Sequence, residues 1–209
     1  MSTIPARPVA PHPQQADKPE LTWEIAELFP PQGMWTEEEY LALGGNRLVE
    51  FSDGRVEVLT LPTELHQMIL AFLFEAMIGW ARPRDAGTAL FSALRVRLRA
   101  GKIREPDIVF MRKENDHRRG NDFWDGADLV MEVVSDDDRR RDLVIKRLEY
   151  AQAGIPEYWI VDPKSSQIIV LKLAGALYAE HGVFSPGEQA TSATLEGFTV
   201  DVTAVFSVK

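Results

Sequence analysis

Residues 128–150, DLVMEVVSDDDRRRDLVIKRLEY, begin with an apolar strand that carries a single carboxylate in its middle. The neighbours of Glu132 are apolar on both faces of this strand, which predicts a central strand covered on both sides. Burying an unpaired charge is costly unless a cation or a dense set of hydrogen bonds meets it. We therefore expect either that Glu132 lies at an exposed strand end or that a positively charged partner lies beside it.

Composition predicts one globular domain preceded by a tail. The chain has 209 residues, of which 45% are hydrophobic and 26% are charged, and this suits a single domain over residues 21–209. Residues 1–20 contain five prolines and few large apolar side chains, so we expect a disordered or extended tail there.

Cysteine usage and charge limit the classes of function. The chain has no cysteine, which excludes disulfides and thiolate metal sites. Its formal net charge of -9 argues against a protein that coats DNA regardless of sequence, although a local basic stripe can still bind nucleic acid. There is no signal-peptide pattern, and the most apolar run, residues 68–78, is too short to span a bilayer. We therefore expect a cytoplasmic protein.

The order of the expected elements predicts an α/β or α+β fold around one central mixed sheet. Helices are expected at residues 36–43, where Thr36 and Glu39 form a capping box, at 63–81 and at about 139–153. Hairpins are expected at 47–59, turning at Asp53-Gly54, and at 89–111, turning near Ala100-Gly101. A polar loop spans 112–126, and the remaining strands are expected at 129–134, 157–161, 168–173, 177–180 and 198–202.

Arginines alternate with apolar residues on the first strand of the second hairpin. If residue 99 lies opposite residue 103, Arg95 faces Asp107 and Arg97 faces Glu105, but a shift of one residue removes both pairs. The alternative is a solvated strand face with cross-strand ion pairs. Pro106 cannot donate a ladder hydrogen bond, so Asp107 is expected at an edge or a distortion.

Asp107 and Glu132 both occupy strand positions where a carboxylate is unexpected. Two carboxylates that converge repel each other unless they share a proton or a metal ion, and oxygen ligands without cysteine suit Mg²⁺ or Mn²⁺. The helix that follows carries Asp142, Lys146 and Tyr150 at steps of four, on one face. Lys146 could reach the strand from there. The alternative is a solvent-facing Asp–Lys pair, since Lys146 lies opposite the apolar stripe Val144, Leu148, Ala151.

These motifs together resemble those of a known family. The run "PD", then "EVVS", then "D…K…Y", then "AGIPEYWIVDP" is similar to the Uma-type putative restriction endonuclease family of the PD-(D/E)XK nuclease superfamily. The likeness covers about residues 36–206 and includes "LVEFSDGRV", which resembles the family's Glu-containing hairpin. His66 falls near a histidine that recurs in the family.

The resemblance implies a restriction-endonuclease-like core, with a mixed sheet flanked by helices, an N-terminal hairpin and a divalent metal on the sheet. It implies that Asp107 is the acid of the "PD" motif and Glu132 the acid of the third motif. Both would hold Mg²⁺ or Mn²⁺, together with the backbone carbonyl of Val133. The lysine normally follows two residues after this acid, where the chain has Val134. The resemblance instead assigns the catalytic lysine to Lys146 on the next helix, with its ammonium group near Glu132.

Further residues are candidates for lining this site: Glu50, His66, Arg95, Arg97 and Tyr150. The arginines would hold a phosphate backbone. Glu50 could instead face solvent, and His66 could be the third residue of a helix capped by Thr63.

The implied function is a metal-dependent endonuclease that hydrolyses DNA phosphodiester bonds. A nucleic-acid- or protein-binding module on a nuclease fold, without turnover, is the alternative, because fold does not fix function. A metal-free carboxylate-pair hydrolase is a third reading, although nothing separates the two carboxyl pKa values as such a pair needs. A homodimer is a further hypothesis, since two copies suit the cutting of two strands.

Overall fold

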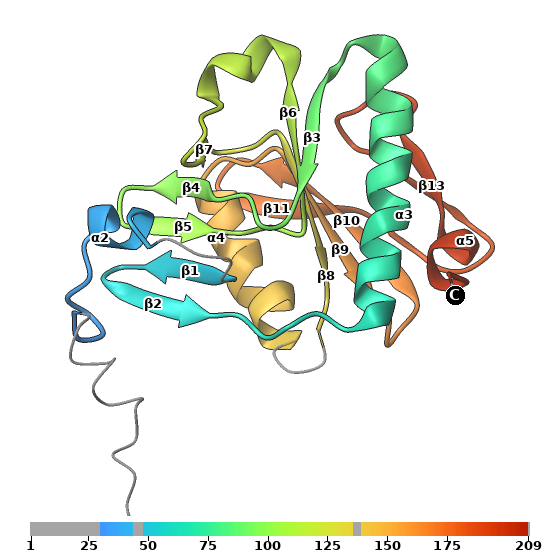
Figure 1. The fold of residues 1–209 in the computed structure, drawn as a ribbon. Coiled ribbons are helices and arrows are strands. Elements are labelled where there is room, and N and C mark those ends of the chain that lie inside the picture. The colour runs from blue at the N-terminus through green and yellow to red at the C-terminus, as the bar shows by residue number, and fades with distance from the viewer. Residues whose placement is uncertain (1–29, 44–47, 136–138, 209) are drawn as a thin grey trace, which may run out of the picture.

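The computed structural model describes residues 30–43, 48–135 and 139–208, so the predicted tail at residues 1–20 lies outside the described part (Figure 1). Its helices are α2 (Glu37–Leu41), α3 (Glu64–Ala81), α4 (Arg147–Gln152) and α5 (Val202–Phe206), with short 3-10 turns at η1 (Arg82–Arg84) and η2 (Lys113–Arg118) and a π-helical segment, η3 (Arg141–Lys146). Its strands are β1 (Val49–Ser52), β2 (Arg55–Val58), β3 (Gly87–Phe91), β4 (Val96–Arg99), β5 (Lys102–Arg104), β6 (Ile108–Arg112), β7 (Trp124–Asp125), β8 (Leu129–Val133), β9 (Glu157–Asp162), β10 (Gln167–Ala174), β11 (Leu177–Phe184), β12 (Gln189–Thr191) and β13 (Thr199–Asp201).

A six-stranded mixed sheet in the order β11-β10-β9-β8-β6-β3 forms the centre of the fold. Strands β8 and β9 run parallel, whereas the other neighbours in this sheet are antiparallel. Every residue of β8 and β9 is buried, which confirms that the strand around Glu132 is central. The predicted fold class, a mixed sheet flanked by helices, is therefore confirmed.

Two hydrophobic clusters cover the faces of this sheet. On one face, α3 packs with Ile69, Leu73 and Met77 against Met131 and Trp159. On the other face, α4 packs with Tyr150 and Ala151 against alternate residues of the same strands. Successive side chains of β8 therefore pack into different clusters on the two faces of the sheet. Glu132 shares a face with Val130 and Val134 and points toward α4.

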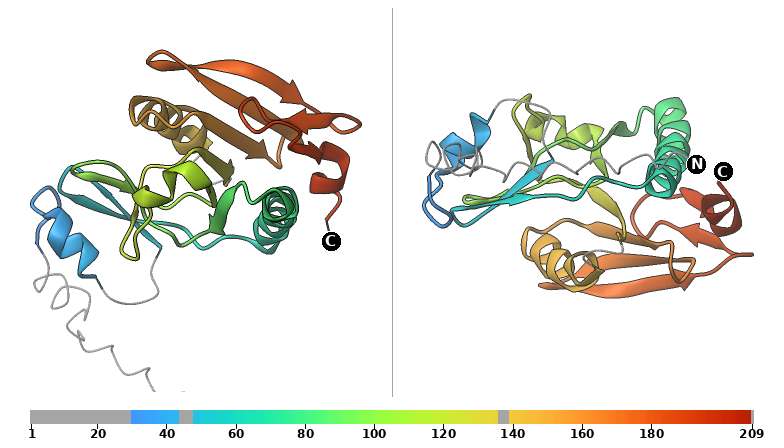
Figure 2. Two further views of the ribbon diagram at one scale, coloured as in Figure 1. Left: turned by 90° about the horizontal axis from the view of Figure 1, so that it is seen from above. Right: turned by 60° about the horizontal axis from the view of Figure 1, so that its bottom comes forward.

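A second sheet, in the order β2-β1-β5-β4-β7, was not expected. Figure 2 separates this sheet, coloured from blue to green, from the orange strands β9 to β11. It contains the predicted N-terminal hairpin of β1 and β2, and Asp53 and Gly54 take the positive φ angles of 48° and 80° that the turn requires. The chain expected as one hairpin at 89–111 divides between the sheets: β4 and β5 pair in this one, whereas β3 and β6 pair in the six-stranded sheet.

The expected pairing of this second hairpin is wrong. Arg99 lies opposite Lys102 across the Ala100-Gly101 turn, and a bulge between Arg97 and Arg99 then places Arg97 opposite Ile103. The extra residue changes the register by one more step. Consequently Arg95 does not face Asp107, and Arg97 does not face Glu105.

The N-termini of helices α2 and α3 have the predicted caps. Thr36 and Glu39 form the expected capping box at α2, and Thr63 accepts a hydrogen bond from the N–H of His66 at α3. The expected last strand appears as β13, whereas β12 and the Asp201-capped helix α5 were not predicted. Within the described residues, no helix has the length and apolar character needed to cross a membrane.

Candidate active site

The pairing of β6 with β8 brings Asp107 and Glu132 together. Ile108 lies opposite Met131 in this antiparallel pair, so the preceding residue, Asp107, comes opposite Glu132 at the end of the ladder. Residues directly opposite in an antiparallel pair project from the same face, with Cβ atoms about 5 Å apart. Asp107 Oδ2 accepts a hydrogen bond of 2.8 Å from the backbone N–H of Val133, which fixes this carboxylate beside the strand that carries Glu132.

Glu132 is buried, and one helix face supplies its partners. The Lys146 ammonium Nζ lies 2.9 Å from Glu132 Oε1. The Tyr150 hydroxyl donates a short hydrogen bond of 2.5 Å to the same oxygen. The carboxylate therefore has the positively charged partner that its place in an apolar strand demands, and the predicted proximity of Lys146 to Glu132 is confirmed.

The helix that carries Lys146 buries its polar side. Asp142, Lys146 and Tyr150 are at most 5% exposed, whereas Val144 and Leu148 are each 47% exposed. An amphipathic helix usually turns its apolar stripe inward. Here the charged groups face the sheet because Glu132 lies there, and the π-helical turn η3 carries both Asp142 and Lys146.

The protonation of the cluster reflects burial and crowded charge. Burial raises the pKa of Glu132 to about 8, and the carboxylates of Asp107 and Asp142 act in the same direction, whereas Lys146 opposes them. Burial lowers the pKa of Lys146, but the surrounding carboxylates, led by Glu132 and Asp142, outweigh it and hold that pKa above its ordinary value. Lys146 therefore stays charged, and Glu132 is the group whose charge depends on its surroundings.

His66 lies beside Asp107 at the first turn of α3. Its Nε2 is 3.1 Å from Asp107 Oδ2, and its Nδ1 is buried without a hydrogen-bond partner among the described residues. Burial lowers the pKa of His66, but the hydrogen bond and charge of Asp107 and the backbone of Val133 hold it above its ordinary value.

Glu50 reaches the cluster from the five-stranded sheet. It is fully buried on β1 and accepts hydrogen bonds of 2.9 Å from Arg104 and 3.0 Å from the backbone N–H of Glu105, and Arg141 also contacts it. Although burial raises the pKa of Glu50, the charges of Lys146, Arg104 and Arg141 bring it down to about 2. Glu50 therefore carries a negative charge close to Lys146 instead of facing solvent.

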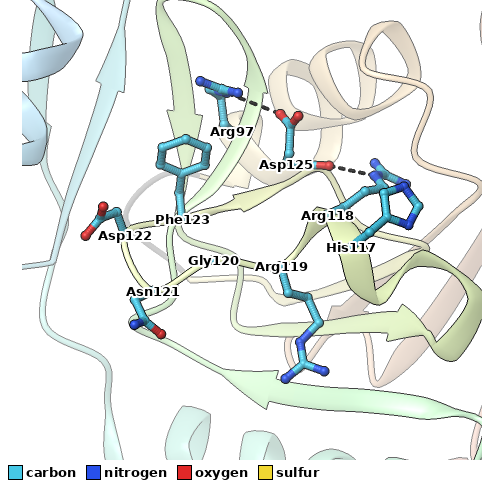
Figure 3. Close-up of a pocket in the computed structure, with 9 residues that line it drawn as sticks. All are labelled: Arg97, His117, Arg118, Arg119, Gly120, Asn121, Asp122, Phe123 and Asp125. Atoms are coloured by element: carbon cyan, nitrogen blue, oxygen red, sulfur yellow. Dashed lines mark hydrogen bonds and ion pairs between the residues drawn. The ribbon is translucent and has the colours of Figure 1, made fainter.

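Arg95 and Arg97 have their contacts elsewhere. Arg95 stacks over Tyr40 at 4.7 Å and lies 3.8 Å from Glu105. Arg97 contacts Asp125 at 3.2 Å and stacks over Phe123 at 4.3 Å. Arg97 also lines a pocket together with residues 117–123 and Asp125 (Figure 3), and this pocket has a volume of about 430 Å³. These contacts do not include Asp107, Glu132 or Lys146.

One family model matches residues 37–203, and its description is Uma2, putative restriction endonuclease. The chain belongs to the Uma2 family. A solved structure, a putative nuclease of the DUF820 group from Anabaena variabilis, has a similar fold, with a TM-score of 0.69 at 18% sequence identity. The alignment covers 82% of this chain and 97% of that one. No curated protein matches the chain.

The Uma2 chain offers oxygen donors of the kind that a divalent metal prefers. In the hydrogen bonds among the described residues, Asp107 accepts through Oδ2 and Glu132 through Oε1, and the second oxygen of each is a candidate to bind another ligand. A cation there would offset the burial of charge and the carboxylate repulsion that together raise the pKa of Glu132. Two such carboxylate oxygens are of the kind that suits Mg²⁺ or Mn²⁺. Across residues 30–43, 48–135 and 139–208, no group of three or more His, Cys, Asp or Glu side chains has the arrangement of a metal site.

Sequence reasoning missed several buried partners of this Uma2 cluster. Asp142 was placed on the lysine's helix face, but its contact with Lys146 at 3.1 Å was not foreseen as part of the site. Arg104 was not singled out, and Arg141 was interpreted as part of a mostly solvated helix start whose arginines contact phosphates, whereas it is half-buried against Glu50. The signal for Asp142 was its spacing of four residues from Lys146, whereas the arginines lie in polar stretches that look solvated.

Proposed function

We propose that this Uma2 chain is a metal-dependent endonuclease that hydrolyses DNA phosphodiester bonds. The observation that carries the proposal is the meeting of Asp107 and Glu132 across two strands, beside a buried Lys146 that contacts Glu132 at 2.9 Å. Family membership supports a nuclease-like function. Perturbed carboxylates next to a buried lysine are a common feature of catalytic sites.

Each residue has a proposed role that its contacts support. Asp107, Glu132 and the carbonyl of Val133 would hold Mg²⁺ or Mn²⁺, and such an ion would supply the activation of water and the neutralisation of phosphate charge. Lys146 orients the attacking water or donates a hydrogen bond to a phosphate oxygen as the pentacovalent state forms. Tyr150 fixes Glu132 through its hydroxyl. His66 holds the Asp107 carboxylate through its contact with Oδ2.

The test is direct incubation of the purified protein with supercoiled, linear and single-stranded DNA, each with Mg²⁺ or Mn²⁺. Cleavage by the wild-type protein and its loss in Asp107→Ala would support the proposal. The Asp107→Ala protein must keep its melting temperature for this comparison, because Asp107 also accepts the N–H of Val133.

The alternative, a module without turnover, has one structural argument in its favour. Lys146 is closely held by two carboxylates, so the lysine serves the fold even without substrate. Wild-type protein that retards DNA in a gel but cleaves none of the three substrates with either metal would favour this alternative. The proposed homodimer is tested separately, by the molar mass of the protein in light scattering.

A further inference from the structure

The Lys146 ammonium group lies between two buried carboxylates. Its Nζ is 2.9 Å from Glu132 Oε1 on the strand and 3.1 Å from Asp142 Oδ1 on its own helix. Asp142 is 5% exposed. Two acceptors from different elements thus restrain one flexible side chain.

From this geometry we infer that Asp142 is a positioning residue that fixes the direction of the Lys146 ammonium group. The inference rests on the proposed function, because it assigns Lys146 a task that needs a defined direction. An ammonium group has three N–H donors and no acceptor. Ion-pair contacts with Glu132 and Asp142 on two sides restrict the orientation of this group, so a remaining N–H donor has a defined direction toward water or a phosphate oxygen.

The helix does not need the Asp142 side chain to stay in place. The backbone carbonyl of Asp142 accepts a hydrogen bond of 3.0 Å from the Tyr158 hydroxyl. Seven residues further along the helix, Glu149 binds Lys102 and Arg104 of β5 at 2.7 Å and 2.8 Å. Since these contacts hold the helix against both sheets, removal of the Asp142 carboxylate should release Lys146 without releasing the helix.

Asp142 and Lys146 do not form an ordinary solvent-exposed ion pair. Surface pairs of this spacing contribute little and are solvated, whereas both members here are buried against the sheet. Both also lie on the π-helical segment η3, and such segments often mark functional positions. Asp142 therefore belongs with the groups that set the geometry of the cluster.

The decisive experiment is a double-mutant cycle on DNA cleavage with Asp142→Ala, Lys146→Ala and the double variant. We expect Lys146→Ala to lower kcat by about 10²- to 10³-fold, as the loss of one transition-state donor typically does. Asp142→Ala should lower kcat by roughly 10-fold and leave KM unchanged, because only the direction of the donor is lost. If Asp142 acts through Lys146, the double variant should cleave as Lys146→Ala does.

Two results would overturn the inference. One is an unchanged kcat in Asp142→Ala, and the other is a double variant whose loss is the product of the two single losses. Asp128→Ala is the matched control. Asp128 is a buried carboxylate that directly precedes β8, at the end of this strand opposite Glu132. This variant should leave the kcat of the folded protein unchanged.

A second measurement separates this inference from the proposed function. The rate at which an amine-reactive ester modifies Lys146 at fixed pH, followed by peptide mass spectrometry, reports how firmly the ammonium group is held. Asp142→Ala should raise this rate several-fold, and Asp128→Ala should not. If the wild-type protein cleaves no DNA, the proposed function fails while this measurement still decides whether Asp142 holds Lys146; an unchanged rate would show that it does not.

Discussion

Glu132 is 3% exposed, and its Oε1 atom receives both the Lys146 ammonium group and the Tyr150 hydroxyl. One oxygen is therefore satisfied by the protein, while Asp107 and Asp142 add negative charge around the same carboxyl group. At the scale of a residue, the consequence is a carboxyl group that binds a proton in the folded protein more readily than in the unfolded chain. A cation bound beside Glu132 would then favour its negatively charged form.

The first prediction follows from this proton. The folded pKa of Glu132, about 8, lies above the ordinary value of 4.5, so its contribution to stability is present at low pH and is lost as the pH rises toward 8. Glu132→Gln removes this dependence. The melting temperature of the variant relative to wild type should therefore increase between about pH 5 and 8. A constant difference across that range in scanning calorimetry would show that Glu132 is not buried as a proton-binding group.

Metal binding should release a proton from the same cluster. A carboxyl group must be deprotonated to bind a metal ion, so the affinity for Mn²⁺ should rise with pH below the pKa of Glu132, about 8. Titration calorimetry in two buffers of different ionisation enthalpy measures the protons released. Equal heats in both buffers, or Mn²⁺ binding by Glu132→Gln as strong as that of wild type, would contradict the assignment of Glu132 as a ligand.

At the scale of an element, periodicity predicted the helices well and the strand register poorly. The residues of α3 follow capping and apolar signals that are local in sequence, whereas no side chain caps η3 or α4. The register of β4 against β5 depends on a bulge between Arg97 and Arg99, which no local pattern announces. No local sequence pattern indicated the π-helical turn either. It buries Lys146 while Val144 and Leu148 stay half exposed, the reverse of what the apolar stripe alone suggested.

Substitution of the lysine tests the role of this helix. Lys146→Ala and Lys146→Arg should both lower kcat by about 10²- to 10³-fold, because a planar guanidinium does not replace a compact ammonium group. Both variants should fold, since a neighbouring carboxyl group can take a proton in place of the lost charge. Circular dichroism and Mn²⁺ titration provide the check on fold and metal binding. Full activity in Lys146→Arg would mean that only a positive charge is required.

At the scale of the whole molecule, the site depends on how two sheets meet. Glu50 comes from the five-stranded sheet and Glu132 from the six-stranded sheet. Arg104 connects the five-stranded sheet to α4 through its ion pair with Glu149. Asp107, Glu132 and Lys146 could be named from the sequence because a carboxylate in an apolar strand is conspicuous and because the resemblance placed the lysine. The buried contacts of Arg104 and the partly buried contact of Arg141 with Glu50 could not be predicted, since they form only when elements distant in sequence pack together.

Loss of Arg104 should therefore destabilise the molecule as a whole. Arg104→Met leaves Glu50 and Glu149 with fewer partners in a buried setting, and removing one member of a buried charge network typically costs about 3–5 kcal/mol. Urea unfolding measures this difference. Arg99→Met is the matched control, because Arg99 pairs with Asp53 at the surface and such pairs contribute up to about 1 kcal/mol. An equal loss in the free energy of unfolding in the two variants would show that the Arg104 network does not join the sheets.

Asp107 lies on the short link between β5 of one sheet and β6 of the other, whereas Glu132 and Lys146 both belong to the six-stranded sheet and its covering helix. The pairing of β6 with β8 and the hydrogen bond from the Val133 N–H nevertheless place Asp107 beside Glu132 without help from the five-stranded sheet. Glu50 is the group that comes from the other sheet, where Arg104 and Arg141 contact it. A substitution that loosened the contact between the sheets would therefore remove the negative charge of Glu50 from beside Lys146 without separating Asp107 from Glu132.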